Sequence, residues 1–165
     1  NRHFAAEQMQ AIWNETLRGE NYSNLNIIPP LAKNSEINEL LNAIDIDLTG
    51  LSGGEGWNLP AFNATCLGKW SLVLNHTAHK DWATQENSIL IEPSGEMPAE
   101  DGVFFTKGSP FNQGTFYTWE EEEIVKAMEK AETKAGQINT EGEKLRDKFT
   151  YSKTVDAILD CIYSS

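Results

Sequence analysis

The chain has few cysteines, few histidines and few basic residues. It contains 2 Cys in 165 residues, and two isolated cysteines at this spacing form neither a disulfide framework nor a zinc site. The 3 His add no ligand set with metal spacing, so no metal is expected. The 13 Lys and Arg face 25 Asp and Glu, which gives a formal net charge of −12. Because nucleic acid is bound through cations that neutralise phosphates, this balance disfavours nucleic acid as a partner.

Long apolar runs and a signal-peptide pattern are also missing from the sequence. No stretch reaches the run of about 18 apolar residues that a membrane-spanning helix needs. A cytoplasmic protein is therefore expected, with a peripheral position at a membrane left open. The Gly-x-Ser-x-Gly elbow of hydrolases is not expected here, and neither the phosphate-loop motif nor Gly-x-Gly-x-x-Gly occurs. This argues against the hydrolases, nucleoside triphosphatases and simple dehydrogenases that these motifs mark.

What is present indicates a folded α/β domain. Hydrophobic residues make up 39% of the chain and include 5 Trp, so residues 1–165 are expected to form one domain with a core. Apolar runs alternate with helical periods along the chain. The predicted strands are 25–28, 46–51, 71–74 and 88–91, and the predicted helices are 4–18, 35–44, 59–68, 79–83, 119–135 and one over 155–162. A repeated strand–helix order favours a parallel sheet with covering helices.

Residues 95–114 interrupt this alternation. They are rich in Gly, Pro and Ser, and two short aromatic runs occur at 103–105 and 115–117. This composition predicts a hairpin or an ordered excursion. Such an excursion would be placed to line a site formed by the preceding elements.

The glycine-rich turn that follows residues 46–51 is the most informative stretch of the chain. An apolar strand runs into Ser52-Gly53-Gly54-Glu55-Gly56, and a helix begins at Leu59 or Pro60. Ligands of open α/β sheets collect at the carboxyl ends of strands, and a helix N-terminus offers free backbone N–H groups to anions. The turn is therefore expected to hold a phosphate through its N–H groups, while Glu55 holds a neighbouring hydroxyl.

The same residues carry a family resemblance. Glu-Gly-aromatic-x-Leu-Pro, followed by a helix of small residues and Gly68-Lys69, resembles the donor-site motif of GT-B retaining glycosyltransferases of the glycosyltransferase 4 type. The resemblance extends from about Leu25 to the last helix. It implies an α/β, Rossmann-like parallel sheet flanked by helices, which forms the C-terminal half of a GT-B fold. In the family a first Glu contacts the donor sugar and a second Glu binds the ribose hydroxyls. Here these positions are Glu55 and Asn63, so the second departs from the pattern.

The resemblance also implies a function and partners. The expected activity is transfer of a hexose from a nucleotide-sugar to a hydroxyl acceptor, such as a glycan or a lipid-linked sugar, in carbohydrate biosynthesis, with no further cofactor. The family's basic pair for the diphosphate has no clear match here. Because a GT-B enzyme has two Rossmann-like halves and the resemblance covers only one, the chain is expected to be a fragment that needs an N-terminal half and is inactive by itself. The implied donor-binding residues are Gly54, Gly56, Trp57, Asn58, Leu59 and Asn63, with Glu55 as the catalytic residue.

Each of these residues also has a structural interpretation. Glu55 could be a solvated turn residue, and Asn63 a polar helix residue that faces solvent. Trp57 would either stack on the donor or fill the helix–sheet junction. His76 and His79 follow a buried strand; they would bind phosphate or deprotonate an acceptor, or have no such role. Asp45-Ile46-Asp47 resembles a metal-binding Asp-x-Asp, but its two carboxylates are expected to lie on different elements.

Two other functions compete with glycosyl transfer. The first is a non-catalytic, degenerate nucleotide-sugar-binding domain, which the Asn at position 63 and the missing basic pair favour. The second is a nucleotide-sugar epimerase of the GT-B fold. An epimerase needs additional acid–base residues, and the sequence offers none that we can assign.

Overall fold

The computed structural model describes residues 6–102, 105–111 and 114–164. The chain divides into two compact units, residues 1–38 and residues 39–165, and each is considered by itself. The prediction of one domain over 1–165 stays a prediction. No helix of the described residues is both long and apolar enough to cross a membrane.

The first unit contains helix α1, Ala6–Thr16, and the start of helix α2, Asn34–Ala43. The predicted strand at 25–28 is wrong, because these residues form no strand. Their apolar side chains are exposed, with Ile27 at 60% and Ile28 at 53%. A strand is stabilised by cross-strand pairs. No such pairing is found here, and Pro29 and Pro30 follow directly.

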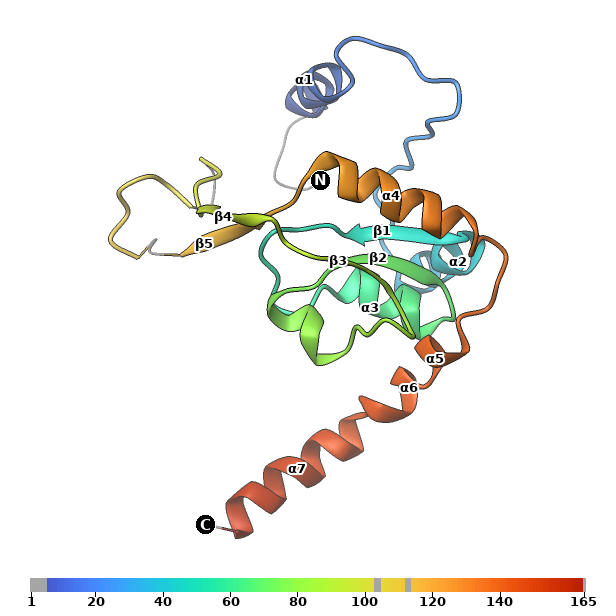
Figure 1. Cartoon of the computed structure of the whole chain (residues 1–165), viewed down its shortest axis with the longest axis vertical. Coiled ribbons are helices and arrows are strands. Elements are labelled where there is room, and N and C mark those ends of the chain that lie inside the picture. The colour runs from blue at the N-terminus through green and yellow to red at the C-terminus, as the bar shows by residue number, and fades with distance from the viewer. Residues whose placement is uncertain (1–5, 103–104, 112–113, 165) are drawn as a thin grey trace. The chain divides into compact units, whose positions relative to one another are not determined.

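The second unit contains a three-stranded parallel sheet (Figure 1). Its order is β1 (Ile46–Gly50), β2 (Trp70–Leu74) and β3 (Ile89–Ile91). Ile46 lies opposite Trp70, and Leu72 lies opposite Ile89. Helix α3, Leu59–Cys66, connects β1 to β2, and the short 3-10 helix η1, Thr77–Asp81, follows β2. The predicted α/β chain with a parallel sheet and flanking helices is confirmed.

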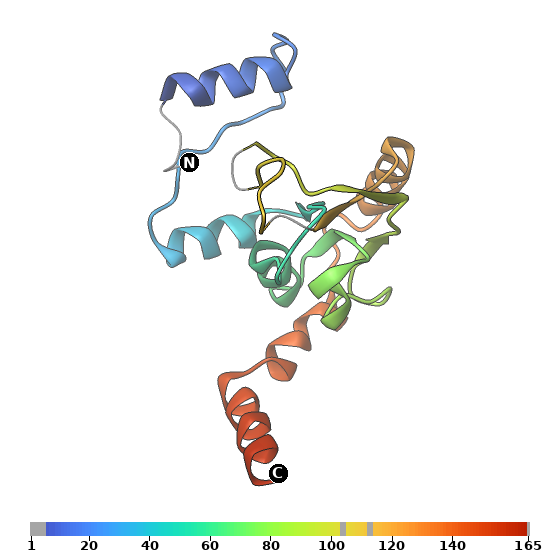
Figure 2. The same ribbon diagram turned by 90° about the vertical axis from the view of Figure 1, so that its left-hand side faces the viewer.

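The two faces of the sheet bury different side chains, because successive residues of a strand point to opposite sides. Val73 packs on the α3 side with Ala61, Trp82 and Leu145, while Leu72 and Leu74 pack on the side of helix α4, Glu121–Glu132. Figures 1 and 2 show α3 and α4 on opposite sides of the sheet. Strand β2 is thus buried on both faces, as is typical of a parallel sheet.

The excursion between β3 and α4 contains a two-stranded antiparallel sheet, which confirms the predicted hairpin. Strand β4, Gly95–Pro98, pairs with β5, Thr115–Thr118, so that Met97 lies opposite Phe116. Of the predicted aromatic run at 103–105, the first two positions lie outside the described residues. Helix α4 starts two residues later than predicted, and Trp119 therefore remains outside the helix.

Three further helices complete the second unit. They are α5 (Thr140–Glu143), α6 (Leu145–Lys148) and α7 (Tyr151–Tyr163). Asn139 stabilises the start of α5: its side chain accepts from the Gly142 N–H at 2.8 Å and donates to the carbonyl oxygens of Lys69 and Asn87. Helix α7 has an apolar stripe at helical spacing, but none of its described residues is buried.

Candidate functional site

The glycine-rich turn leaves the carboxyl end of β1 and is held against β5. The Tyr117 N–H donates to the Gly53 carbonyl oxygen at 2.8 Å. A Cβ atom on Gly53 would lie 2.5 Å from the Tyr117 carbonyl oxygen. Only glycine permits so close an approach of two backbones. The hairpin therefore fixes the first part of the turn.

Asn58 fixes the end of the turn, where α3 begins. Its backbone is left-handed, with φ 59°, and its side-chain oxygen accepts from the Ala61 N–H at 3.3 Å. The side-chain amide donates to the Thr49 carbonyl oxygen at 2.8 Å. Asn58 is buried, and its side chain joins β1 to the first turn of α3. Because its side chain is used in this way, Asn58 could contact a nucleotide-sugar only through its backbone.

Trp57 fills the junction between α3 and the C-terminal helices. Its ring packs edge-on against Phe62, with centroids 5.5 Å apart, and against Phe149 at 5.2 Å. Its carbonyl oxygen accepts from Trp82 Nε1 at 3.1 Å. These contacts give Trp57 a packing role between α3 and Phe149, and stacking on a donor stays a prediction.

The remaining residues of the motif face outward. Gly54, Gly56, Leu59 and Asn63 are exposed, and Glu55 is half-buried. Leu59 and Asn63 are four residues apart on α3, so they share one face of the helix. Within the described part of the chain, the backbone N–H groups of residues 55–57 and Leu59 donate to no acceptor. The turn therefore presents unused donors beside the Glu55 side chain.

His76 links the turn to the end of β2. Its Nε2 lies 2.8 Å from the Ser52 carbonyl oxygen, and its Nδ1 lies 2.8 Å from Thr77 Oγ1. A carbonyl only accepts, so Nε2 carries the proton and the Thr77 hydroxyl donates to Nδ1. Both ring nitrogens are thereby used, and the buried His76 positions Ser52 and the turn behind it.

His79 lies behind His76, with ring centroids 5.1 Å apart. By the same reasoning its Nδ1–H donates to the Leu74 carbonyl oxygen at 2.8 Å. Its Nε2 is buried and has no partner among the described residues. Burial lowers the pKa of both histidines, and the nearby Glu55 carboxylate opposes this in part. Both rings are therefore neutral at pH 7, and a contact from either to phosphate or acceptor stays a prediction.

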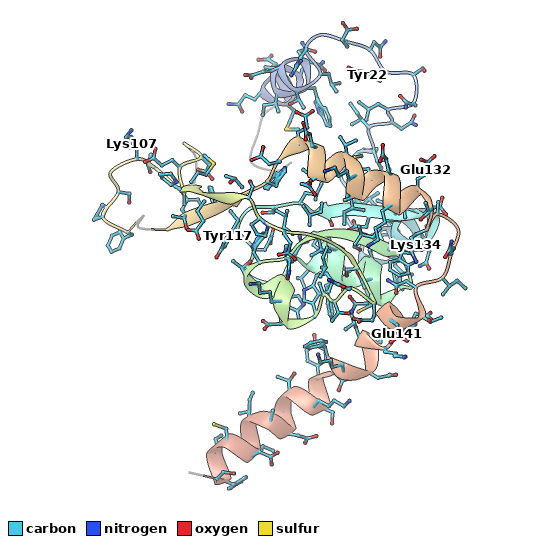
Figure 3. All side chains as sticks on the ribbon, viewed as in Figure 1. Tyr22, Lys107, Tyr117, Glu132, Lys134 and Glu141 are labelled. Carbon is cyan, nitrogen blue, oxygen red and sulfur yellow. The ribbon has the colours of Figure 1, made fainter. Side chains whose placement is uncertain are left out.

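Residues of the excursion complete the surroundings of the turn. The Tyr117 ring stacks on His76, with centroids 4.8 Å apart and ring planes at 22°. Tyr117 belongs to strand β5 and is labelled in Figure 3. Next to it is a pocket of about 390 Å³. The sequence indicated the aromatic run at 115–117, but it did not indicate that Tyr117 stacks on His76. The pocket is lined by Ser52, Gly53, Gly54, Met97, Phe116, Tyr117, Thr118 and Trp119.

The sequence around Ser52 shows that the expected absence of a Gly-x-Ser-x-Gly motif is wrong. Residues 50–54 match Gly-x-Ser-x-Gly, the pattern of a hydrolase nucleophile elbow. The Ser52 hydroxyl instead donates to the Gly54 carbonyl oxygen at 3.3 Å, and His76 contacts the backbone of Ser52. A nucleophile and its base must be within hydrogen-bonding reach of each other. Ser52 is therefore not arranged as a nucleophile.

The two carboxylates of Asp45-Ile46-Asp47 point to separate partners, as expected. Asp47 is buried, and its carboxylate accepts from the Thr49 hydroxyl at 2.9 Å. Burial raises the pKa of Asp47, and its bonds to Thr49 partly offset this. Asp45 accepts from the Gly136 N–H at 3.2 Å. Among the described residues, no group of three or more His, Cys, Asp or Glu is placed to hold a metal ion.

No family model matches the chain, and no curated protein matches it. The functional argument therefore depends on the turn itself, on Glu55 at its tip and on the exposed start of α3.

Proposed function

We propose that this chain is the donor-binding domain of a nucleotide-sugar-dependent retaining glycosyltransferase, one half of a GT-B fold. One observation carries the proposal. Glu55 stands at the tip of a glycine-rich turn, between the carboxyl end of a parallel strand and the exposed N-terminus of α3. Open α/β sheets bind their ligands at this position.

The unused N–H groups support a phosphate-binding role. Those of residues 55–57 and Leu59 have no acceptor in the described part of the chain. The Leu59 N–H belongs to the first turn of α3 and those of residues 55–57 precede it in the sequence, so an anion bound there would be near the positive end of the helix dipole. This explains how a chain with a net charge of −12 would bind an anionic donor. The attraction comes from the backbone and does not require a cluster of lysine or arginine.

Glu55 would then meet the sugar. In the proposed complex its carboxylate accepts hydrogen bonds from hydroxyls of the hexose and orients the anomeric carbon. Its negative charge also lies where positive charge develops in an oxocarbenium-like transition state. The buried His76 and His79 are near enough to interact electrostatically with this carboxylate. A half-buried position makes such a charge more effective than it would be in open water.

Asn63 marks the place of the ribose in this arrangement. It lies on the exposed face of α3, one turn beyond Leu59. An amide can hold one ribose hydroxyl, but a carboxylate makes stronger, charge-assisted bonds. This exposed Asn favours one alternative, a domain that binds a nucleotide-sugar without transferring it. A chain of this kind would bind the donor and show no turnover with any acceptor.

The open face of the turn supports a partner in catalysis. Gly54, Gly56 and Leu59 are exposed in this chain, so a donor bound there would remain in contact with water. We propose that an N-terminal half of the same enzyme covers it and helps to bind the hydroxyl acceptor. Weak donor binding and no transfer are therefore expected of the isolated chain.

A titration followed by NMR tests the proposal, because it detects weak binding. The ¹⁵N-labelled chain is titrated with UDP-, GDP- and ADP-hexoses, and amide shifts are mapped on the sequence. We expect one nucleotide class to shift the amides of residues 54–59 and Asn63. Shifts confined to other parts of the chain, or none with any donor at about 10 mM, a range of very weak binding, would contradict the proposal.

A further inference from the structure

The pocket beside the turn has a lining unlike that of a phosphate site. It holds about 390 Å³ between residues 52–54, strand β5 and Trp119. None of its lining residues carries a charge, and the large apolar and aromatic residues among them are Met97, Phe116, Tyr117 and Trp119. Its size falls in the range of small-molecule pockets, which are mostly apolar with a few polar groups.

The walls of this pocket are held by the backbone. The Tyr117 N–H donates to the Gly53 carbonyl oxygen at 2.8 Å, and the Ser94 N–H donates to the Thr118 carbonyl oxygen at 2.8 Å. Phe116 lies over the turn, since a Cβ on Gly54 would be 3.0 Å from its Cδ1 atom. The ring of Phe105 packs edge-on against Phe116, with centroids 5.4 Å apart. The pocket is thus a feature of the folded hairpin and turn.

The order of residues along the turn gives the pocket its place in the proposed reaction. Residues 56–59 would hold the phosphates and Asn63 the ribose, so the nucleotide runs along α3. Gly53 and Gly54 lie on the other side of Glu55 in the sequence, and they line the pocket. The pocket is therefore next to the sugar end of the donor, where the acceptor must arrive. This step depends on the proposed function.

We infer that this pocket binds the acceptor, and that the bound group is an uncharged pyranose ring. The negative faces of aromatic rings attract the C–H groups of the apolar face of a pyranose. Ser52, whose hydroxyl donates to the Gly54 carbonyl oxygen, and Thr118 are the lining residues with a hydroxyl, and both hydroxyl oxygens can accept from the edge of the ring. A phosphate finds no cation in this lining, and a plain alkyl chain would leave these hydroxyls without a new partner.

Titration of the chain with simple glycosides, in the absence of nucleotide, tests the inference. Methyl glucoside, galactoside and mannoside are added to the ¹⁵N-labelled chain up to about 50 mM, because single-ring contacts give millimolar affinity. We expect at least one to shift the amides of residues 52–54 and 116–119. Phe116→Ala should weaken that binding about fivefold to tenfold, the value of one aromatic contact.

The chain offers a matched control in the same excursion. Phe111 is 96% exposed and does not line the pocket, so Phe111→Ala should leave glycoside binding unchanged. Met97→Ala supplies a second test, because Met97 lines the pocket with an exposed side chain. It should weaken binding even if Phe116→Ala alters the hairpin.

Four results would overturn the inference. The first is that no glycoside shifts the amides of residues 116–119, and the second is that Phe111→Ala and Phe116→Ala change glycoside binding equally. The third is that hexanol shifts these amides and glycosides do not. The fourth is that only nucleotide-hexoses shift them, which would place the donor hexose in the pocket. Donor binding at 54–59 without glycoside shifts at 116–119 would leave the proposed function intact. Glycoside binding without donor binding would support the pocket and contradict the proposed function.

Discussion

Replacing Gly53 by alanine tests how the turn is held against the hairpin. The added Cβ would lie 2.5 Å from the Tyr117 carbonyl oxygen and 3.4 Å from Phe116 Cβ. The first of these neighbours is a backbone atom, so it cannot rotate away. Strand β5 or the turn must move, and the bond from the Tyr117 N–H to the Gly53 oxygen, now 2.8 Å, must lengthen.

The expected cost follows from these two effects. Overpacking at a fixed backbone costs about 1–3 kcal/mol, and a lost hydrogen bond adds about 0.5–1.5 kcal/mol. We expect Gly53→Ala to reduce the free energy of unfolding by about 2–3 kcal/mol. In a chain of this size, each kcal/mol lowers Tm by about 2–4 °C. The expected decrease in Tm is therefore about 4–12 °C.

Thermal unfolding followed by circular dichroism measures this effect, and the same turn supplies the control. A Cβ on Gly56 would meet no atom within 4 Å, and neither glycine has a positive φ. Gly56→Ala should therefore change the stability by about 0.5 kcal/mol or less. Equal Tm values for the two variants would refute the described contact between the turn and β5.

Three further predictions concern stability and reactivity. Asn58→Ala should lower the free energy of unfolding, measured in urea, by about 2 kcal/mol, because the variant loses the helix cap and keeps a left-handed backbone. Asn58→Gly should lower it less, since glycine adopts that backbone without strain. Equal losses for the two variants would contradict this account. Burial in the folded state lowers the pKa of His76 and His79 below the ordinary 6.5. As the pH falls, the unfolded chain therefore takes up protons first, and the free energy of unfolding should decrease between pH 7.5 and 5.5. An unchanged free energy of unfolding over this range, measured in urea, would refute this prediction. Burial raises the pKa of Cys66 to about 11, so a thiol reagent at pH 8 should label the exposed Cys161 and reach Cys66 only in urea; fast labelling of both would show that Cys66 is accessible.

The positions of the three strands of the parallel sheet were predictable, because short apolar runs in the local sequence mark them. The apolar runs at 46–51, 71–74 and 88–91 mark β1, β2 and β3 to within one residue. The run at 25–28 has the same appearance and forms no strand. Whether an apolar run becomes a strand depends on a partner strand, which the run itself does not encode.

The site was predictable in position but not in its contacts. The turn, Glu55 and the start of α3 follow from a glycine-rich stretch between a strand and a helix. The packing of Trp57 on Phe149 and the stacking of Tyr117 on His76 join residues far apart in the sequence. No local pattern determines such contacts, and they decide which side chains of the motif remain open to a ligand.

The most direct test of the central claim compares a nucleotide-hexose with its nucleotide alone, in the wild-type chain and in Glu55→Gln. If Glu55 holds the hexose, the wild type should bind the nucleotide-hexose more tightly than the nucleotide alone. Glu55→Gln should reduce the affinity for the nucleotide-hexose about 10- to 100-fold, the value of a charged hydrogen bond. Binding of the nucleotide alone should not change. Glu86→Gln, at an exposed glutamate outside the turn, should affect neither ligand. Equal binding of the nucleotide-hexose by the wild type and Glu55→Gln would contradict the assignment of the donor site.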